Sequence, residues 1–186
     1  AGLPSATRHL GVPTMGGIPP QAATVSLSSA APRPLLCTDA AGLHPRTADL
    51  RAVGWAVAAP DGAVLATGTL RRGASVVAGE LEAVIVGYRY AAESGTLVTD
   101  CLSVARAWAT LRRHVATPRR YQKGPLAAGW ARLAAAAAAK PTVQLEWMPS
   151  HLEAGDAAKQ GIPAPWHAGN QAADAAAKQA AAAAAP

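Results

Sequence analysis

What the sequence has little of narrows the class of protein before any motif is considered. Cysteine occurs only at positions 37 and 101, without C-x-x-C spacing, so we expect two core thiols of a reducing compartment and no disulfide framework. No apolar run approaches the roughly 20 residues of a membrane span. The N-terminus has neither the charged start nor the apolar block of a signal peptide. We therefore expect a soluble, intracellular monomer, nuclear or cytoplasmic, without a membrane partner.

Acidic residues are missing from one long block of the chain, between Cys101 and Lys140. The bases of this block are Arg106, Arg112, Arg113, Arg119, Arg120, Lys123, Arg132 and Lys140. Because the whole chain has a net charge of only +6, positive charge is concentrated here, which favours a polyanion such as a nucleic acid as partner. A solvated helix face would also explain the charge taken alone.

The domain organisation follows from composition and length. Residues 1–33 are rich in Pro and Ala, which predicts a poorly ordered linker or tail. The chain of 186 residues is long enough for one domain with its own core, which we place at residues 34–180. Residues 181–186 are then an alanine-rich C-terminal tail.

The apolar spacing predicts strands, then alternating helices and strands. The expected strands are 35–38, 53–58, 63–70, 96–99 and 142–148, and the expected helices are 79–92, 103–113, 125–140 and 170–185. Pro60-Asp61-Gly62 predicts a tight turn between the second and third strands. Hairpins followed by helical crossovers indicate an α/β domain with a mixed five-stranded sheet, three antiparallel strands and then parallel ones, flanked by helices.

Carboxylates occupy positions that such a fold would bring together. Asp39 and Asp100 each follow a predicted strand, whereas Glu80 and Asp174 lie in the first turns of predicted helices. Ligands of open sheets bind at the carboxyl ends of the strands. Carboxylates gathered there repel one another unless hard cations such as Mg²⁺ lie between them. Two such ions can promote phosphoryl displacement, so the acids and the basic block together predict a nuclease.

At this point the chain resembles the ribonuclease H type 1 domain. The matching segments are Leu36-Cys37-Thr38-Asp39, Gly79-Glu80-Leu81-Glu82-Ala83, Leu97-Val98-Thr99-Asp100, Trp147-Met148-Pro149-Ser150-His151 and Gly169-Asn170-Gln171-Ala172-Ala173-Asp174-Ala175-Ala176-Ala177. They keep the order Asp, Glu, Asp, His, Asp between about residue 35 and about residue 180. The last two segments look most like the version in non-LTR retrotransposon polyproteins.

The resemblance implies a ribonuclease H-like fold and a metal-dependent endonuclease that hydrolyses the RNA strand of RNA/DNA hybrids, leaving a 5′-phosphate and a 3′-hydroxyl. Asp39, Glu80, Asp100 and Asp174 would be catalytic ligands of two Mg²⁺ ions, for which Mn²⁺ can substitute. His151 would be a catalytic residue on a mobile loop that assists water positioning or product departure. The implied partners are the hybrid and a reverse transcriptase of the same polyprotein.

The resemblance also gives the basic loop a role, as the protrusion that holds the hybrid in part of the family. Its nucleic-acid-binding residues would be Arg112, Arg113, Arg119, Arg120 and Lys123. Such side chains contact phosphates without reading sequence, so binding should weaken steeply with salt. Tyr121 in the same loop could stack on a base.

Two assignments have competitors in the sequence. Glu82 lies two residues beyond Glu80, but positions two apart face different sides of a helix. His167 precedes Ala168-Gly169 in a pattern that resembles the histidine loop of the family, whereas His151 has the Trp147-x-Pro-Ser context. We assign the roles to Glu80 and His151 and keep His167 as the alternative.

The chain departs from the family pattern where substrate contacts would begin. Ala40 and Ala41 follow the first Asp in place of Gly-Ser, polar residues are replaced at Val77, Ala78 and Leu102, and residues 152–168 form a long insert. A second hypothesis is therefore a catalytically weak or inactive ribonuclease H-like module that binds nucleic acid or serves structurally. A DNA transposase or resolvase of the same broad fold fits the last acid less well.

Overall fold

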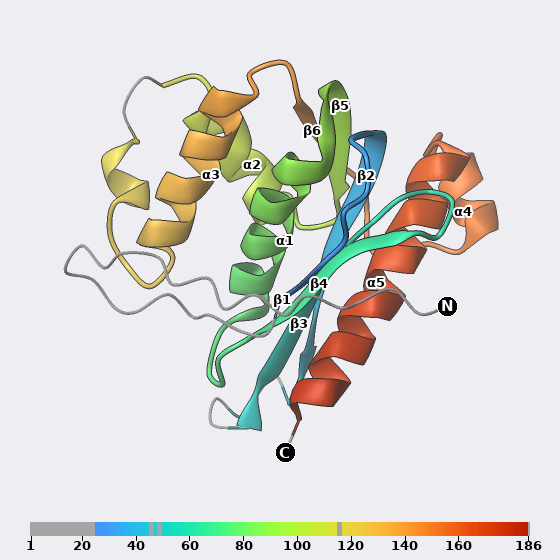
Figure 1. The fold of residues 1–186 in the computed structure, drawn as a ribbon, viewed down its shortest axis with the longest axis horizontal. Helices are drawn as coiled ribbons and strands as arrows, with labels where there is room; N and C mark the ends of the chain where they lie inside the picture. Colours follow the sequence, from blue (N-terminus) through green and yellow to red (C-terminus); the bar gives the residue numbers. More distant parts are fainter. Residues whose placement is uncertain (1–24, 45–46, 48–49, 115–116, 186) are drawn as a thin grey trace.

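The computed structural model describes residues 25–44, 47, 50–114 and 117–185 (Figure 1). Its strands form one sheet in the order β1-β4-β3-β2-β5-β6. Their bounds are β1 Val25–Leu27, β2 Arg33–Leu43, β3 Ala52–Ala58, β4 Val64–Leu70, β5 Ala91–Thr99 and β6 Gln144–Trp147. The pairs from β1 to β2 are antiparallel, and β2, β5 and β6 are parallel. The predicted α/β class and mixed sheet are confirmed.

The predicted number of five strands is wrong by one. The additional strand, β1, pairs with β4 at the edge of the sheet and lies inside residues 1–33, which the composition assigned to a linker. Residues 1–24 of that linker lie outside the described part of the chain. At the other end, the last helix continues to Ala184 and Ala181 is fully buried, so most of the predicted C-terminal tail is helical.

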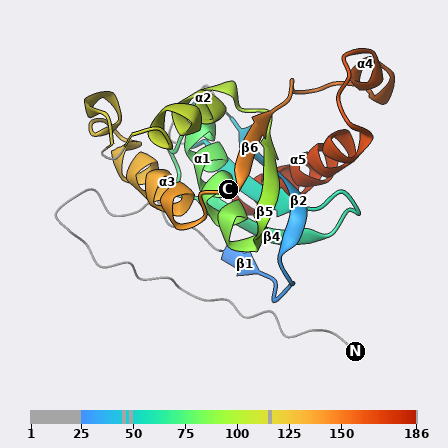
Figure 2. The same ribbon diagram turned by 90° about the horizontal axis from the view of Figure 1, so that it is seen from above.

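The helices are divided between the two faces of the sheet. Their bounds are α1 Val76–Tyr90, α2 Leu102–Leu111, α3 Ala127–Ala139, α4 Ala154–Lys159 and α5 Ala164–Ala184, with a 3-10 turn, η2, at Arg119–Tyr121. Figure 1 shows α1, α2 and α3 on one side of the sheet and α5 on the other, and Figure 2 shows α4 projecting beyond the end of α5. None of the described helices is both long and apolar enough to cross a membrane.

The apolar core follows the alternation of side chains along β2. Leu36 belongs to the larger core beneath α1, α2 and α3, and Cys37 to a smaller one that contains Met148 and Ala173 of α5. The residues of α1 that recur at intervals of three and four, Leu81, Val84, Ile85 and Tyr88, are buried in the larger core. The sheet therefore separates two cores, one for each helical layer.

Small residues allow α5 to lie unusually close to the sheet. A Cβ atom at Gly54 of β3 would come within 2.3 Å of the Ala177 carbonyl oxygen and the Ala181 amide nitrogen. Because α5 presents mainly alanine to β3, its backbone can rest against the strand. The alanine run is thus part of the packing as well as a helix former.

We predict that Gly54→Ala destabilises the fold by about 1–3 kcal/mol or more, because the added methyl group overlaps backbone atoms that cannot move independently. Urea unfolding followed by circular dichroism measures the change. Gly155→Ala in α4 is the matched control, since no heavy atom lies within 4 Å of its added Cβ. Equal stabilities of the two variants would contradict this account of the α5 contact.

Candidate functional site

The site begins where β2 extends further than its parallel neighbour. The pairing of β2 with β5 ends at Thr38 and Thr99, whereas β2 continues alongside β3 to Leu43. Asp39 is the first residue beyond the parallel pairing, and Asp100 directly follows β5. The prediction that the strand ends at Asp39 is wrong, because antiparallel pairing with β3 keeps the chain extended. The prediction for Asp100 is confirmed.

The other two predicted acids come from helices on opposite faces of the sheet. Glu80 lies in the second turn of α1, because Ser75 caps the helix by accepting a hydrogen bond from the Ala78 amide at 3.2 Å. Asp174 lies in the middle of α5, which already begins at Ala164. Both were predicted in first helical turns, and those positions are wrong. The helix dipole therefore has little influence on either carboxylate.

Three carboxylates converge at this opening in the sheet. Oxygens of Asp39, Glu80 and Asp100 lie within 4.8 Å of one another. Asp39 and Glu80 are each 5% exposed, and Asp100 is half-buried. Within the described residues, the buried Oε2 of Glu80 has no hydrogen-bond partner. An all-oxygen donor set with an unused buried oxygen fits a hard divalent cation such as Mg²⁺.

Burial and mutual repulsion keep protons on this cluster. Burial, followed by the charges of Asp100 and Asp174, raises the pKa of Asp39 to about 8. Burial and the charge of Asp39 also raise the pKa of Glu80 well above its usual range. Burial raises the pKa of Asp100, an effect opposed by a hydrogen bond from Asn170 and by His151. Without a cation, the buried pair therefore carries at least one proton near neutral pH.

Asp174 lies beside this cluster rather than inside it. It acts on both Asp39 and Asp100 by charge repulsion, but it is not part of the group of oxygens within 4.8 Å. Its Oδ2 accepts a hydrogen bond from Lys178 Nζ at 2.7 Å, one helical turn further along α5. Of the four predicted ligands, the structure brings three together and pairs the fourth with a lysine.

The two competing histidines occupy different surroundings. His151 is exposed in the segment after β6, with a φ of 54°, and its positive charge lowers the pKa of Asp100. His167 is buried on α5, where its Nε2 lies 2.7 Å from the Leu152 carbonyl oxygen. The geometry of a loop residue near the acids thus belongs to His151, whereas His167 attaches the inserted segment to α5.

Asn170 is a site residue that the sequence reasoning did not select. It lies in α5, is 8% exposed and lowers the pKa of Asp100 by hydrogen bonding through its side chain. It lies four residues before Asp174, so both project from the same face of the helix. That spacing inside the Gly-Asn-x-Ala-Ala-Asp segment was the available signal.

The predicted nucleic-acid-binding residues divide into two groups. Arg119 and Lys123 are exposed, and the side chain of neither has a hydrogen-bond or ion-pair partner within the described part of the chain. In contrast, Arg113 Nε donates to the Ala109 carbonyl at 2.7 Å, and Arg120 donates to Thr110 Oγ1 at 3.0 Å. Arg113 and Arg120 are thus each anchored by one hydrogen bond, although their other guanidinium N–H groups can still meet a phosphate.

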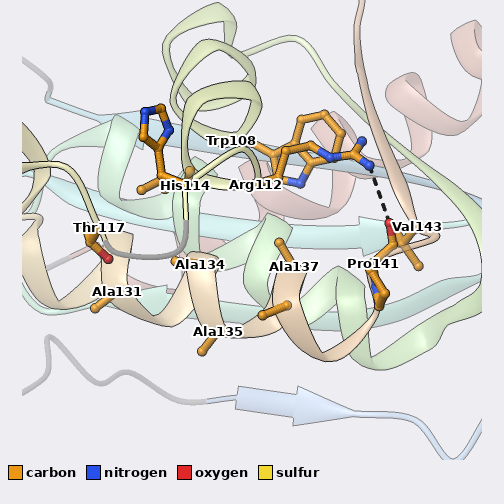
Figure 3. Close-up of a pocket in the computed structure, with 12 residues that line it drawn as sticks. Trp108, Arg112, His114, Thr117, Ala131, Ala134, Ala135, Ala137, Pro141 and Val143 are labelled. Atoms are coloured by element: carbon orange, nitrogen blue, oxygen red, sulfur yellow. Dashed lines mark hydrogen bonds between the residues drawn. The ribbon is translucent and has the colours of Figure 1, made fainter.

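Arg112 is fixed on the wall of a cleft between α2 and α3. Its guanidinium lies 4.6 Å from the centre of the Trp108 ring and donates to Gln144 Oε1 at 2.6 Å and to the Pro141 carbonyl. Figure 3 shows alanines of α3 along the opposite wall of this cleft, whose volume is about 380 Å³. Tyr121 is half-buried and packs edge-on against Trp130, with ring centres 5.5 Å apart. Arg112 and Tyr121 are therefore both engaged within the chain, whereas the prediction for the basic loop requires side chains that are free to contact a nucleic acid.

The first departure from the family pattern has a packing explanation. Ala40 is buried on the α1 side of β2, where a Cβ added at Gly79 would lie 2.8 Å from its own Cβ. A larger side chain at this position would meet helix α1. Trp147, by contrast, is 40% exposed, and its indole N–H donates to the Asp100 carbonyl at 3.0 Å.

Comparison with known proteins identifies the fold. No protein-family model and no curated protein sequence matches the chain. Among solved structures, the PFV ribonuclease H domain in solution aligns with a TM-score of 0.56 at 15% identity, over 80% of this chain and 94% of that one. LC11-RNase H1 in complex with an RNA/DNA hybrid aligns with a TM-score of 0.51 at 12% identity, over 80% and 96%.

A longer protein contains the same fold. The foamy viral protease-reverse transcriptase in complex with an RNA/DNA hybrid aligns with a TM-score of 0.53 at 14% identity, over 95% of this chain but only 22% of that one. The present chain therefore spans about a fifth of that protein's length. Together the alignments show that the chain has the ribonuclease H-like fold.

The raised pKa of Asp39 predicts a stability that depends on pH. Because the pKa rises from 3.8 to about 8 on folding, the native state binds this proton more tightly than the unfolded state. The stabilisation is complete below about pH 4 and is lost as the pH rises through about 8. In EDTA, the Tm of Asp39→Asn should therefore increase relative to wild type across this range.

Thermal unfolding at several pH values measures that difference, and Mg²⁺ supplies a second comparison. At pH 8, millimolar Mg²⁺ should raise the Tm of the wild type more than that of Asp39→Asn, because the cation replaces the protons of the cluster. Asp61→Asn, in an exposed turn, is the control. A Tm difference between Asp39→Asn and wild type that is independent of pH would contradict the assignment.

Proposed function

We propose that the chain is a metal-dependent ribonuclease H that hydrolyses the RNA strand of RNA/DNA hybrids. The observation that carries the proposal is the convergence of Asp39, Glu80 and Asp100 within 4.8 Å at the end of the parallel strands. The ribonuclease H-like fold supports it, as do its neighbours in fold, two of which were solved with RNA/DNA hybrids.

The three converging acids would hold Mg²⁺ or Mn²⁺, with Asp174 as a fourth ligand once Lys178 releases it. When bound, two such ions supply a stabilised water nucleophile and stabilise the leaving oxygen in phosphodiester hydrolysis. Asp39 and Glu80 come from rigid, buried elements, so they fix the position of the site. Asp100 lies at its exposed side, where the phosphodiester would enter.

His151 acts in this proposal from the edge of the site. Its exposed side chain lies close enough to Asp100 to lower the pKa of that carboxyl by charge. A positive φ of 54° holds a non-glycine residue in a conformation that L-amino acids rarely adopt. We assign His151 to positioning water or assisting the departure of the product.

The hybrid would be held mainly by the exposed cations of the loop between α2 and α3. Arg119 and Lys123 supply contacts to phosphate, which depend on charge and not on sequence. Arg113 and Arg120 can join them, because each guanidinium uses one N–H in its hydrogen bond within the chain and has others for a phosphate. Since one neighbour in fold is part of a protease-reverse transcriptase, a reverse transcriptase in the same polyprotein is our proposed partner.

A non-catalytic binding module is the second candidate, and a specific observation favours it. Ala40, Ala41, Val77, Ala78 and Leu102 border the acids without polar side chains that could bond to a nucleic acid. Such a module would bind the hybrid through the basic loop and leave it intact. The retained buried acids argue for catalysis, because a purely structural site would gain stability by losing them.

A cleavage assay separates the two candidates. Wild-type protein with Mg²⁺ or Mn²⁺ should cut the RNA of a labelled hybrid and leave duplex DNA and duplex RNA intact. Asp39→Asn and Asp100→Asn should lower the rate roughly 100-fold or more, as expected when a charge-stabilising group is removed. Asp156→Asn, in an exposed i,i+3 pair on α4, should cut like the wild type. Hybrid binding without cleavage in either metal would favour the non-catalytic module.

The two groups of basic residues should behave differently in hybrid binding. The double variant Arg119→Ala/Lys123→Ala should bind less tightly and reduce the slope of log affinity against log salt by about 1 for each phosphate that it no longer neutralises. Arg112→Ala should keep the salt slope, and lower the stability by about 1 kcal/mol because its stacking on Trp108 is removed. Fluorescence anisotropy at several salt concentrations, with thermal unfolding, measures both. A salt slope that changes more for Arg112→Ala than for the double variant would overturn the division into free and anchored basic residues.

A further inference from the structure

Asn170 is a buried polar residue that the proposed chemistry leaves without a role. It is 8% exposed, and its side chain lies close enough to Asp100 to lower the pKa of that carboxyl by hydrogen bonding. Its Oδ1 atom, however, is buried and has no hydrogen-bond partner within the described residues. A buried carbonyl oxygen without a donor costs free energy, so the absence of a donor requires an explanation.

The position of Oδ1 follows from the geometry of the amide group. A carboxylate can accept only from the amide nitrogen, so Nδ2 faces Asp100. The two amide atoms share one planar carbon, which places Oδ1 within reach of a single water molecule from the same carboxylate. The unsatisfied oxygen therefore borders the three-acid cluster.

The neighbouring side chains supply no donor for this oxygen. Asp39, Glu80 and Asp174 only accept hydrogen bonds once they are ionised. Lys178 is bound to Asp174 at 2.7 Å, and His151 is an exposed loop residue. Within the described part of the chain, the donor must therefore come from a molecule that enters the site.

We propose that Asn170 is a positioning residue for the cation, whose Nδ2 orients Asp100 and whose Oδ1 accepts a hydrogen bond from a water of the cation's hydration shell. The inference rests on the proposed function, because it requires a cation at Asp39, Glu80 and Asp100. Groups in this outer position orient the ligands of a metal and hold its waters. Mg²⁺ in particular keeps several waters when it binds to protein carboxylates.

Asn170→Leu tests the proposal, because leucine has a similar shape without either polar atom. Removing a group beyond the direct ligands should weaken Mg²⁺ binding roughly tenfold or more. The Tm of the metal-free variant should not fall, because the variant also removes the unsatisfied oxygen. Isothermal titration with Mg²⁺ and thermal unfolding in EDTA measure the two effects. A residue with only a structural role would give the reverse, a lower Tm and an unchanged affinity.

Three further variants separate the two halves of the side chain's role. Asn170→Asp keeps acceptor oxygens but loses the donor, and should bind Mg²⁺ more tightly than Asn170→Leu. Gln171→Asp, at the exposed neighbouring position, controls for the added charge, and Gln171→Leu controls for the added apolar group. If Asn170→Asp and Asn170→Leu bind Mg²⁺ equally weakly, the acceptor has no role and the proposal is overturned.

The outcomes also distinguish this inference from the function on which it rests. A wild-type protein that binds no Mg²⁺ would remove the basis of both. A wild type that binds Mg²⁺ and cuts hybrids, beside an Asn170→Leu variant with the same Mg²⁺ affinity, would overturn the inference alone. Weaker hybrid binding by that variant in EDTA, at unchanged Mg²⁺ affinity, would place the missing donor on the nucleic acid and would also overturn it.

Discussion

The repulsion between carboxylates buried at an opening of the sheet is the constraint on which the rest of the site depends. Asp39 and Glu80 are buried and lie within a few ångströms of Asp100, and within the described residues neither forms an ion pair with a basic side chain. Such a cluster costs stability until protons or cations compensate its charge. The two packed cores on either side of the sheet have to supply that stability. Lys178 forms an ion pair with Asp174 and acts on Asp39 through its charge alone.

The order of the elements and the convergence of three acids could be predicted, because both depend on local patterns. Apolar spacing identified the strands and the buried face of α1, and Asp100 follows its strand as expected. The predicted ends of strands and helices were wrong where tertiary contacts extend an element. Ala40, Ala41 and Gly42 suggest a turn by composition, yet pairing with β3 keeps them in the strand. Proline at 163 and 165 suggests a break, but α5 tolerates proline in its first turn.

Other features of the structure could not be predicted from local sequence patterns. Strand β1 has three residues and forms through long-range pairing with β4. The hydrogen bonds from Arg112 to Gln144 and Pro141 join segments about thirty residues apart, whereas charge density alone treats all bases of the loop alike. The pairing of Asp174 with Lys178 is visible as an i,i+4 spacing, but whether it competes with a cation depends on three-dimensional placement.

The extension of β2 beyond β5 also makes the site a junction between two otherwise separate layers. Glu80 belongs to the layer of α1 and its large mixed core, whereas Asn170 and Asp174 belong to α5, which rests on glycine and alanine. A small sliding of α5 along the sheet would move two of the polar groups and leave the other acids in place. The ligand set can thus be adjusted by changes in the alanine-lined interface, without repacking the principal core. Helix α5, although it consists largely of alanine, therefore carries the part of the site whose position can change.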